Sequence, residues 1–483
     1  MPYTSTMFFS ILPEISILVL IVLLLVLEPF WKGESRHSAG WMTAGGLLAI
    51  MAVSLLVGRP GDPEVVFGGM IRFDWLGFFF KMMFIFAAGI TALFMMDHDV
   101  LGKRGDSYIL LLSSLLGMNL MAASSDLIML YLAIETTSIP LYVLAGFMIS
   151  DKSSTEAGFK YLLYGAMASA IMLYGFSLLF GFAGTTNIYE LAAMTGAGQL
   201  SMPVVLGVVM MVIVGLGFKV SIVPFHFWAP DTYTGSPTPV AGFLSTASKA
   251  AGFAVLVRLF IVAFPELASN WGFILAVFAA ITMTVGNLVA LKQTNIKRLL
   301  AYSSIAHAGY AMIGVVTVSS LGVTSVVFYL LAYIVTNLAA FGTVMVFSRV
   351  TGSDEIKDYA GLSRRSPGLA LAMLVAFLSL AGMPPFGGFV AKVFVFAAAV
   401  KVNMIWLAVV GIINSIIGVY YYLIVLKVVY LYRMEGENEE AHPIQMPRPY
   451  SIALVVVSVG VLLVGTLFAP WFSMSSAAAN LLF

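Results

Sequence analysis

Apolar runs of about 20 residues, the length that spans a bilayer as an α-helix, recur along the whole chain. The connections between them, the longest at 183–201 and 432–449, are too short to form a soluble domain. The pattern therefore predicts an all-α membrane protein with about fourteen transmembrane helices. The expected spans are 8–30, 41–58, 74–96, 107–123, 126–149, 160–182, 202–223, 238–264, 271–291, 298–318, 321–348, 367–400, 405–431 and 450–471.

Composition agrees with this pattern, because 61% of the 483 residues are hydrophobic and only 10% are charged. An average soluble domain has about 25% charged residues. The net charge of +1 gives no electrostatic case for binding nucleic acid. The chain has no cysteine, which excludes disulfides, iron–sulfur clusters and thiolate metal sites.

Lysine and arginine are distributed unequally between the two sides of the predicted bundle. Outside the spans, fifteen fall on one side and three, Arg59, Arg72 and Lys401, on the other. The positive-inside rule then places both termini outside the cytoplasm. The bias and the short loops favour a multi-pass protein of a bacterial cell (inner) membrane.

Six basic residues remain inside the predicted spans, where a cation costs about 2.5–3.5 kcal/mol on insertion scales. Lys81, Arg258 and Lys427 lie near span ends or can extend to the interface, so we expect them to have no special role. The other three, Lys219, Lys249 and Lys392, adjoin long apolar runs and are predicted to be functional.

Two stretches about 170 residues apart resemble each other, one beginning at Tyr161-Leu-Leu-Tyr-Gly and the other at Tyr329-Leu-Leu-Ala-Tyr. Five spans fit into this offset, and an odd number inverts the second copy. The sequence therefore predicts two inverted five-helix repeats, as in many secondary transporters. The expected parts are 1–106 (helices 1–3), 107–264 (helices 4–8), 271–431 (helices 9–13) and 450–483 (helix 14).

Prolines interrupt the spans next to the buried lysines. They occur at Pro224 and Pro230, in Ser236-Pro-Thr-Pro, and in Gly382-Met-Pro-Pro-Phe-Gly-Gly. A helix break inside a bilayer persists only where protein or water satisfies the freed backbone groups. We therefore expect broken helices beside polar cavities, with simple proline kinks as the alternative.

Glu135 in the fifth span is a lone acid among apolar residues, and Lys219 is its candidate partner. A carboxylate that moves toward or away from a buried ammonium changes how tightly the amine holds its proton. Two residues of this kind are sufficient for a proton switch. The alternative is a static ion pair that holds two helices together.

Further candidates follow along the chain. Lys249 lies among serine and threonine residues that can hold water, and His307 follows Ser303-Ser304. Histidine can relay protons, although it also occurs as a purely structural residue. Lys392 would be the far element of a chain from Lys219 through Lys249 and His307, whereas Asp126 and Asp231 at span ends are expected to be caps or loop contacts. The set suits protons better than a metal ion, although carbonyl oxygens could still hold sodium.

The segment from Lys219 to Lys249, with Tyr233-Thr-Gly-Ser-Pro-Thr-Pro-Val and then Ser248-Lys249, resembles the antiporter-like membrane subunits of respiratory complex I, the proton-translocating NADH–quinone oxidoreductase. The resemblance is closest to its subunit N. The length and Lys392 agree, since subunit M has glutamate at the latter position.

This resemblance implies a translocase subunit with roles for individual residues. Glu135 and Lys219 would form a modulating pair, Lys249 a central relay and Lys392 the residue that hands protons outward, with His307 as a link. The resemblance also implies that this chain carries no cofactor. NADH, FMN, iron–sulfur clusters and quinone would lie on other subunits, and subunits M, K and J would be partners beside the lipid bilayer.

The sequence also allows two other functions. A multi-subunit Mrp-type cation/proton antiporter shares this ancestry and needs no electron donor. A structural scaffold with inert ion pairs needs no proton transfer at all.

Overall fold

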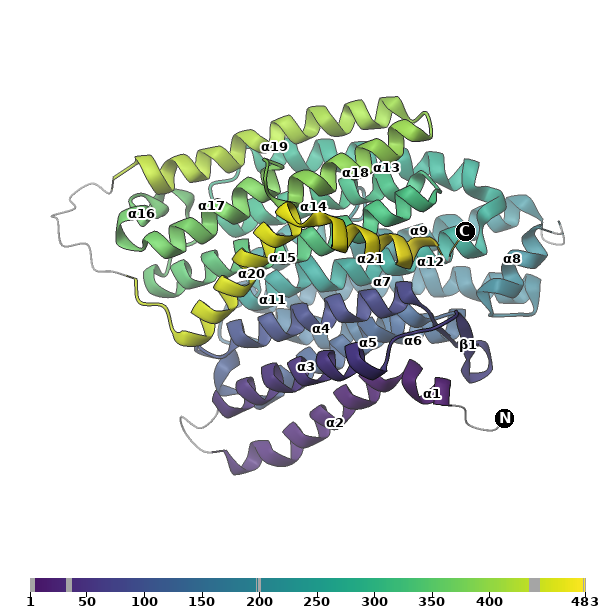
Figure 1. The fold of residues 1–483 in the computed structure, drawn as a ribbon, viewed down its shortest axis with the longest axis horizontal. Coiled ribbons are helices and arrows are strands. Elements are labelled where there is room, and N and C mark those ends of the chain that lie inside the picture. Colours follow the sequence, from purple (N-terminus) through teal and green to yellow (C-terminus); the bar gives the residue numbers. More distant parts are fainter. Residues whose placement is uncertain are drawn as a thin grey trace.

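A computed structural model describes residues 5–31, 37–196, 198, 201–433, 444–480 and 482, and shows a bundle of helices that run roughly along one long axis (Figure 1). Within these residues, thirteen helices are long and apolar enough to cross a membrane. The twelfth expected span, 367–400, consists of two shorter helices, Pro367–Ala381 and Gly387–Lys401. The predicted all-α membrane fold is therefore confirmed.

The N-terminal part consists of four helices and a small antiparallel hairpin. Asp74 caps the last of these helices by accepting a hydrogen bond from the Gly77 amide. The hairpin pairs Glu64 with Phe73 and lies in a connection for which the hydropathy pattern predicted no regular structure. These elements are α1 (Ser5–Ser10), α2 (Leu12–Leu27), α3 (His37–Val57), β1 (Glu64–Val66), β2 (Ile71–Phe73) and α4 (Trp75–Met95).

The helices of the expected first repeat follow. The seventh expected span, 202–223, is a helix as far as Val220, and a separate short helix, Trp228–Gly235, follows it. A π-helical turn, Leu244–Ser248, joins the two parts of the eighth span. The elements are α5 (Gly105–Ala123), α6 (Leu127–Ala145), α7 (Lys152–Ala183), α8 (Ile188–Gly196), α9 (Met202–Val220), α10 (Trp228–Gly235), α11 (Thr238–Phe243) and α12 (Lys249–Ala263).

The second repeat and the C-terminal helices complete the bundle. The predicted last span, 450–471, was wrong in detail, because the chain bends at Leu467 and continues as a separate helix. The elements are α13 (Ala268–Ala290), α14 (Ile296–Val316), α15 (Ser320–Thr351), α16 (Leu362–Arg365), α17 (Pro367–Ala381), α18 (Gly387–Lys401), α19 (Ile405–Leu431), α20 (Arg448–Thr466) and α21 (Phe468–Asn480).

Backbone pairing shows the repeat independently of sequence. The Leu127 amide donates to the Thr186 carbonyl at 2.9 Å, and the Ile296 amide donates to the Asp354 carbonyl at 2.8 Å in the equivalent place. Each long helix, α7 and α15, ends at a left-handed glycine. The two pairings lie beside α8 and α16, which are at opposite ends of the bundle (Figure 1). This is the relation expected of inverted repeats.

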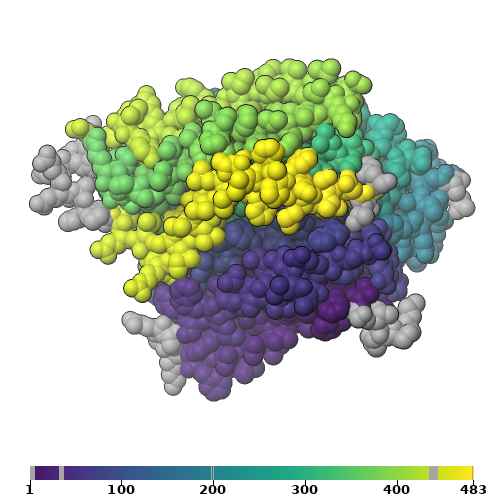
Figure 2. Space-filling view, viewed as in Figure 1, coloured from purple at the N-terminus to yellow at the C-terminus, as the bar shows by residue number. Residues whose placement is uncertain are grey.

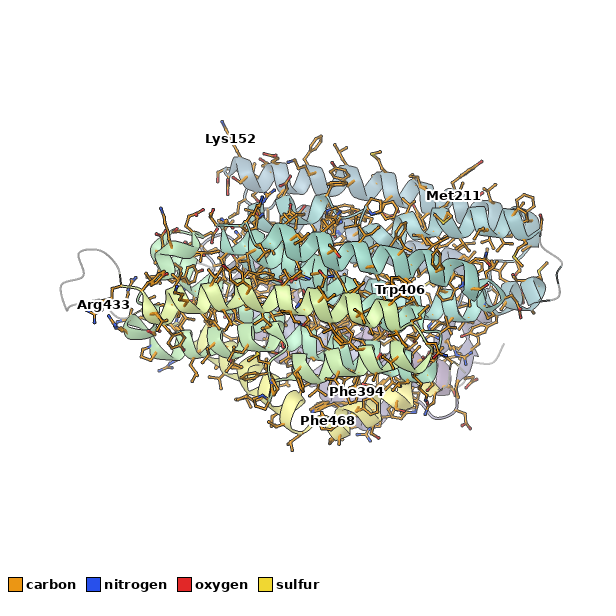
Figure 3. The ribbon with its side chains drawn as sticks, turned by 90° about the horizontal axis from the view of Figure 1, so that it is seen from above. Lys152, Met211, Phe394, Trp406, Arg433 and Phe468 are labelled. Carbon is orange, nitrogen blue, oxygen red and sulfur yellow. The ribbon has the colours of Figure 1, made fainter. Side chains whose placement is uncertain are left out.

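The C-terminal helices α20 and α21 run between the N-terminal helices and the second repeat on one face of the molecule (Figure 2). They attach to α18 through aromatic rings. Phe394 lies 4.3 Å from Phe472 and 6.0 Å from Phe468, measured between ring centroids (Figure 3). The helix that carries Lys392 is therefore covered by the end of the chain.

Candidate proton-transfer site

The first helix break follows Lys219, the second-last residue of α9. Ser221 ends the helix with a left-handed backbone, φ +62°. The Trp228 indole donates to the Phe218 carbonyl at 3.0 Å, and the Thr282 hydroxyl accepts from the Val223 amide at 3.0 Å. Side chains thus satisfy backbone groups that the break releases, as burial in a membrane requires.

Lys392 lies after the second break, near the start of α18. Its ammonium donates to the Leu380 and Ala381 carbonyls and to the Ser415 hydroxyl, each at 3.0 Å. These carbonyls are at the C-terminus of α17, where the helix dipole favours a cation. Gly382 ends that helix at φ +83°, and a Cβ there would lie 2.9 Å from Cδ of Lys392.

Glu135 and Lys219 face each other across serine hydroxyls rather than in direct contact. The Lys219 ammonium donates to the Ser138 hydroxyl at 2.9 Å, and the Ser169 hydroxyl donates to Glu135. Ser138, Ser169 and Lys219 line one cavity. Within the described part of the chain, no Glu135–Lys219 ion pair occurs at 4.0 Å or less. The serine partners of the acid and the base thus line the same cavity.

Lys249 begins α12, immediately after the π-helical turn. It is 2% exposed, and its ammonium donates to the Ser304 carbonyl at 2.7 Å and to the Ser304 hydroxyl at 2.5 Å. Gly252, about one turn further along α12, lies against the Lys219 stem, because a Cβ there would be 3.2 Å from Cγ of Lys219. Lys219 and Lys249 are therefore on helices in close contact.

His307 connects the region of Lys249 to that of Lys392. Its Nδ1 lies 2.6 Å from the Tyr329 hydroxyl and its Nε2 lies 3.4 Å from the Tyr422 hydroxyl. Tyr422 also hydrogen-bonds Ser303, the neighbour of Ser304. Two hydrogen-bonded groups thus lie side by side, Lys249 with Ser304 and Ser303 with Tyr422 and His307, because Ser303 and Ser304 are adjacent on α14.

The last step to Lys392 crosses a small cavity. His307 and Tyr329 line it on one side, and Leu380 and Ala391 line it on the other. The Leu380 carbonyl accepts from Lys392. Lys219, Lys249, His307 and Lys392 thus lie on neighbouring elements, but no hydrogen bond among the described residues joins Lys219 to Lys249 or His307 to Lys392.

Two of the three cations expected near span ends or at the interface are instead deeply buried and paired. Lys81 lies 2.7 Å from Glu14, and Arg258 donates to Asp74 at 2.7 and 2.8 Å. That interpretation was wrong because hydropathy does not show a partner on another helix. Lys427 is exposed, as expected.

The two aspartates that were expected to be caps or loop contacts differ. Asp126 caps α6 by accepting from the Ile128 and Met129 amides. Asp231 instead joins both repeats at the basic end, because it pairs with Lys160 at 2.7 Å and with Arg298 at 2.9 Å.

The serines and tyrosines of the path were not predicted. Apolar helices commonly contain hydroxyl residues, so Ser138, Ser169, Tyr329 and Tyr422 gave no distinct signal. Glu14 was missed although it is an acid inside an apolar run, which is a detectable signal. Among the described residues, no group of three or more His, Cys, Asp or Glu is arranged to hold a metal ion.

Comparisons with known proteins place this geometry in a family. Residues 124–418 match the model of the NADH:quinone oxidoreductase/Mrp antiporter transmembrane family. The NADH-quinone oxidoreductase subunit N of Moorella thermoacetica is 45% identical over 88% of this chain and 88% of its own length. That of Trichlorobacter lovleyi is 41% identical over 94% and 93%.

Solved structures agree. A chain of respiratory complex I from Thermus thermophilus with bound aureothin is 34% identical, with a TM-score of 0.80, covering 95% of this chain and 98% of that one. A chain of the Mrp complex from Dietzia has a TM-score of 0.87 at 21% identity, covering 99% and 98%, and shows the shared fold. This chain therefore belongs to the NADH:quinone oxidoreductase/Mrp antiporter transmembrane family, among the NADH-quinone oxidoreductase subunits N.

Proposed function

We propose that this chain is the proton-translocating subunit N of an NADH-quinone oxidoreductase and moves protons across a bacterial inner membrane. The observation that carries the proposal is the polar path through Lys249, Ser304, Ser303, Tyr422 and His307, which leads to the cavity beside Lys392. Buried cations of this kind are costly in a membrane, and they commonly mark proton or ion pathways.

Each site residue has a role in this proposal. Lys219 holds or releases its proton according to the position of the Glu135 carboxylate, with Ser138 and Ser169 between them. Lys249 is the central relay, His307 passes the proton between two tyrosine hydroxyls, and Lys392 delivers it to the outer side.

Energy has to reach this chain from its neighbours. NADH, FMN, iron–sulfur clusters and quinone are expected on other subunits, and membrane subunits such as M, K and J are the expected partners. Quinone reduction elsewhere would then drive the movement of Glu135 relative to Lys219. In this role the chain is a translocase subunit without a redox centre of its own.

The proposal is tested with the intact complex in proteoliposomes. Lys219→Ala, Glu135→Ala and Lys249→Ala should lower both quinone reduction and proton translocation, whereas replacement of the exposed Lys427 by alanine should lower neither. An assembled Lys219→Ala complex that translocates protons with wild-type stoichiometry would contradict the proposed path.

The second candidate is a subunit of a multi-subunit Mrp-type cation/proton antiporter. The likeness to the Dietzia Mrp chain favours it only at the level of fold. A sodium requirement for transport without an electron donor would support this candidate instead.

A further inference from the structure

A second set of buried charges lies outside the path described above. It consists of Glu14 on α2, Arg72 on β2, Asp74 at the start of α4, Lys81 within α4, and Arg258 on α12. We call these five residues the N-terminal charge cluster. Four of them precede residue 124, where the family match begins. The cluster therefore belongs mostly to the part of the chain that surrounds the two repeats.

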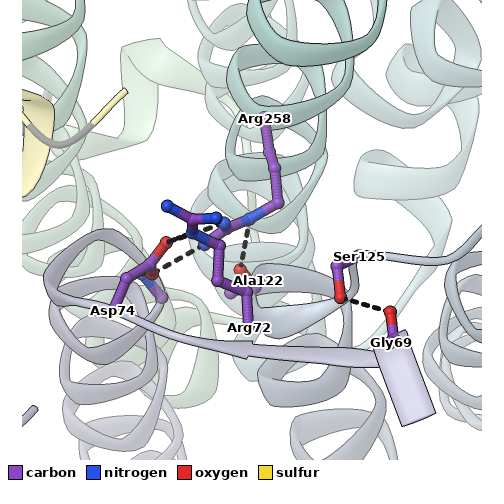
Figure 4. A network of polar contacts seen from close by, with 7 residues as sticks. Gly69, Arg72, Asp74, Ala122, Ser125 and Arg258 are labelled. Atoms are coloured by element: carbon purple, nitrogen blue, oxygen red, sulfur yellow. Dashed lines mark hydrogen bonds and ion pairs between the residues drawn. The ribbon is translucent and has the colours of Figure 1, made fainter. Parts of the chain in front are cut away.

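Asp74 and Arg258 form the half of this cluster in which the carboxylate accepts several hydrogen bonds (Figure 4). Both guanidinium NH2 groups of Arg258 donate to Asp74, at 2.7 and 2.8 Å, while Arg72 adds a third hydrogen bond at 3.1 Å and the Gly77 amide a fourth at 2.8 Å. Burial alone raises the pKa of Asp74, but Arg258 outweighs this effect and holds the pKa below its ordinary value. This carboxylate stays charged and fastens α4 to α12.

Glu14 and Lys81 form the other half of the cluster, in which the carboxylate has few partners. Their charged atoms lie 2.7 Å apart, and both side chains are about 5% exposed. The Lys81 ammonium also donates to the Ser10 carbonyl at 2.9 Å. Neither Glu14 oxygen has a regular hydrogen bond among the described residues, so the Lys81 ammonium is its single ionic partner.

One cavity joins the two halves. Lys81 and Ser10 line it on one side, and Arg72, Asp74 and Gly77 line it on the other. Lys81 lies seven residues beyond Asp74, which places it about 10 Å deeper along α4 at the rise of an α-helix. A polar cavity of this kind is a place where water can bridge charged groups.

We propose that Glu14 and Lys81 form a second proton-binding site, which exchanges protons with the side of the membrane that carries α1 and the β1–β2 hairpin. This inference rests on the proposed function, which makes proton movement the task of the chain. The occupant is a proton delivered by water in the cavity between Lys81 and Asp74.

The difference between the two halves decides which carboxylate takes the proton. Four hydrogen bonds stabilise the charged form of Asp74, whereas Glu14 has one ionic partner and is as deeply buried. Lys81 lines the cavity and Glu14 does not, so in the uptake step an N–H bond of Lys81 breaks as an O–H bond forms on Glu14, and Lys81 regains a proton from a hydronium ion, which leaves water. Lys81 ends the step charged and hydrogen-bonded to the Ser10 carbonyl, and release is the reverse step.

The test uses the intact complex with the double variant Glu14→Gln, Lys81→Met. Replacing both charges avoids an unpaired buried ion, and such replacements are often neutral for stability. We expect the complex to assemble and reduce quinone, but with fewer protons translocated per electron than the wild type. Lys427→Met serves as the matched control for removing a lysine at an exposed position.

A second measurement does not depend on assembly with the double change. Infrared difference spectra between high and low pH should contain a protonated-carboxyl band that is absent in Glu14→Gln. An unchanged ratio of protons to electrons in the double variant, together with an unchanged carboxyl band in Glu14→Gln, would show a static helix clamp and overturn the inference. If Lys249→Ala still lowers translocation in that case, the proposed function stands; if Lys249→Ala also has no effect, the proposed function fails as well.

Discussion

The two broken helices hold their lysines in different ways. Lys219 precedes its break, and its ammonium has one hydrogen-bond acceptor among the described residues, the Ser138 hydroxyl. Lys392 follows its break and has three acceptors, two of which are carbonyls at the end of α17. A weakly held cation responds to a nearby acid, whereas a firmly held cation keeps its position. In the proposed function, this difference makes Lys219 the controlled residue and Lys392 a fixed end of the path.

The largest effect is expected from filling the space at the second break. Gly382→Val places a side chain at φ +83°, where a left-handed backbone costs about 1–2 kcal/mol, and also pushes against Lys392. We expect loss of assembly or of proton translocation, measured by complex yield and by proton uptake in proteoliposomes.

The equivalent position in the first break provides the matched control. Ser221 has φ +62° with a side chain already present, so alanine needs no new backbone conformation there. Ser221→Ala should therefore leave assembly and translocation close to wild type. Equal damage from both substitutions would show that the two breaks do not differ in the way described.

Replacing each lysine by alanine tests this difference through the loss of stability. Lys392→Ala leaves two buried carbonyls without this donor, at about 1–3 kcal/mol for each unsatisfied group. Among the described residues, the one hydrogen bond that Lys219→Ala removes is to the Ser138 hydroxyl, which also donates to the Ile134 carbonyl, and packing of the Lys219 stem against Gly252 is lost as well. Both variants should lose translocation, but thermal unfolding in detergent should show the larger loss of stability for Lys392→Ala. A greater destabilisation by Lys219→Ala would reverse the assignment of the fixed and the controlled lysine.

The smallest structural change concerns the hydroxyl bridge of the first repeat. Ser138→Ala and Ser169→Ala remove the groups between Lys219 and Glu135 and should lower translocation by about 10-fold or more, in the range of a proton-transfer contribution, with thermal stability changed by about 1 kcal/mol. Thr136→Ala, on the same helix but bonded to the Leu132 carbonyl, is the control. Wild-type rates of proton translocation in both serine variants would show that these hydroxyl groups take no part in proton transfer.

Sequence alone predicted the spans, the inverted repeat and the helix breaks, because hydropathy, offset and proline are local or periodic signals. The break at 382–386 beside Lys392 is an example. The partners of Lys81 and Arg258 were not predictable in this way, since Glu14 and Asp74 come from distant positions and only packing brings them together.

The candidate site shows the same division. Its lysines, Glu135 and His307 are rare residue types in apolar helices and are detected directly in the sequence. The hydroxyl groups that connect them are common there, and only side-chain geometry distinguishes Ser303 or Tyr422 from other serines and tyrosines. For the same reason, the sequence could not show that serines separate Glu135 from Lys219.

The proposed function requires that protons pass from Lys249 to His307 through the Tyr422 hydroxyl. The direct test is the number of protons translocated per electron by the intact complex carrying Tyr422→Phe, which removes only this hydroxyl. Tyr420→Phe is the control on the same helix, since the Tyr420 side chain is exposed and lies outside the path. We expect a lower ratio for Tyr422→Phe and a wild-type ratio for Tyr420→Phe, whereas a wild-type ratio for Tyr422→Phe would contradict the proposed path.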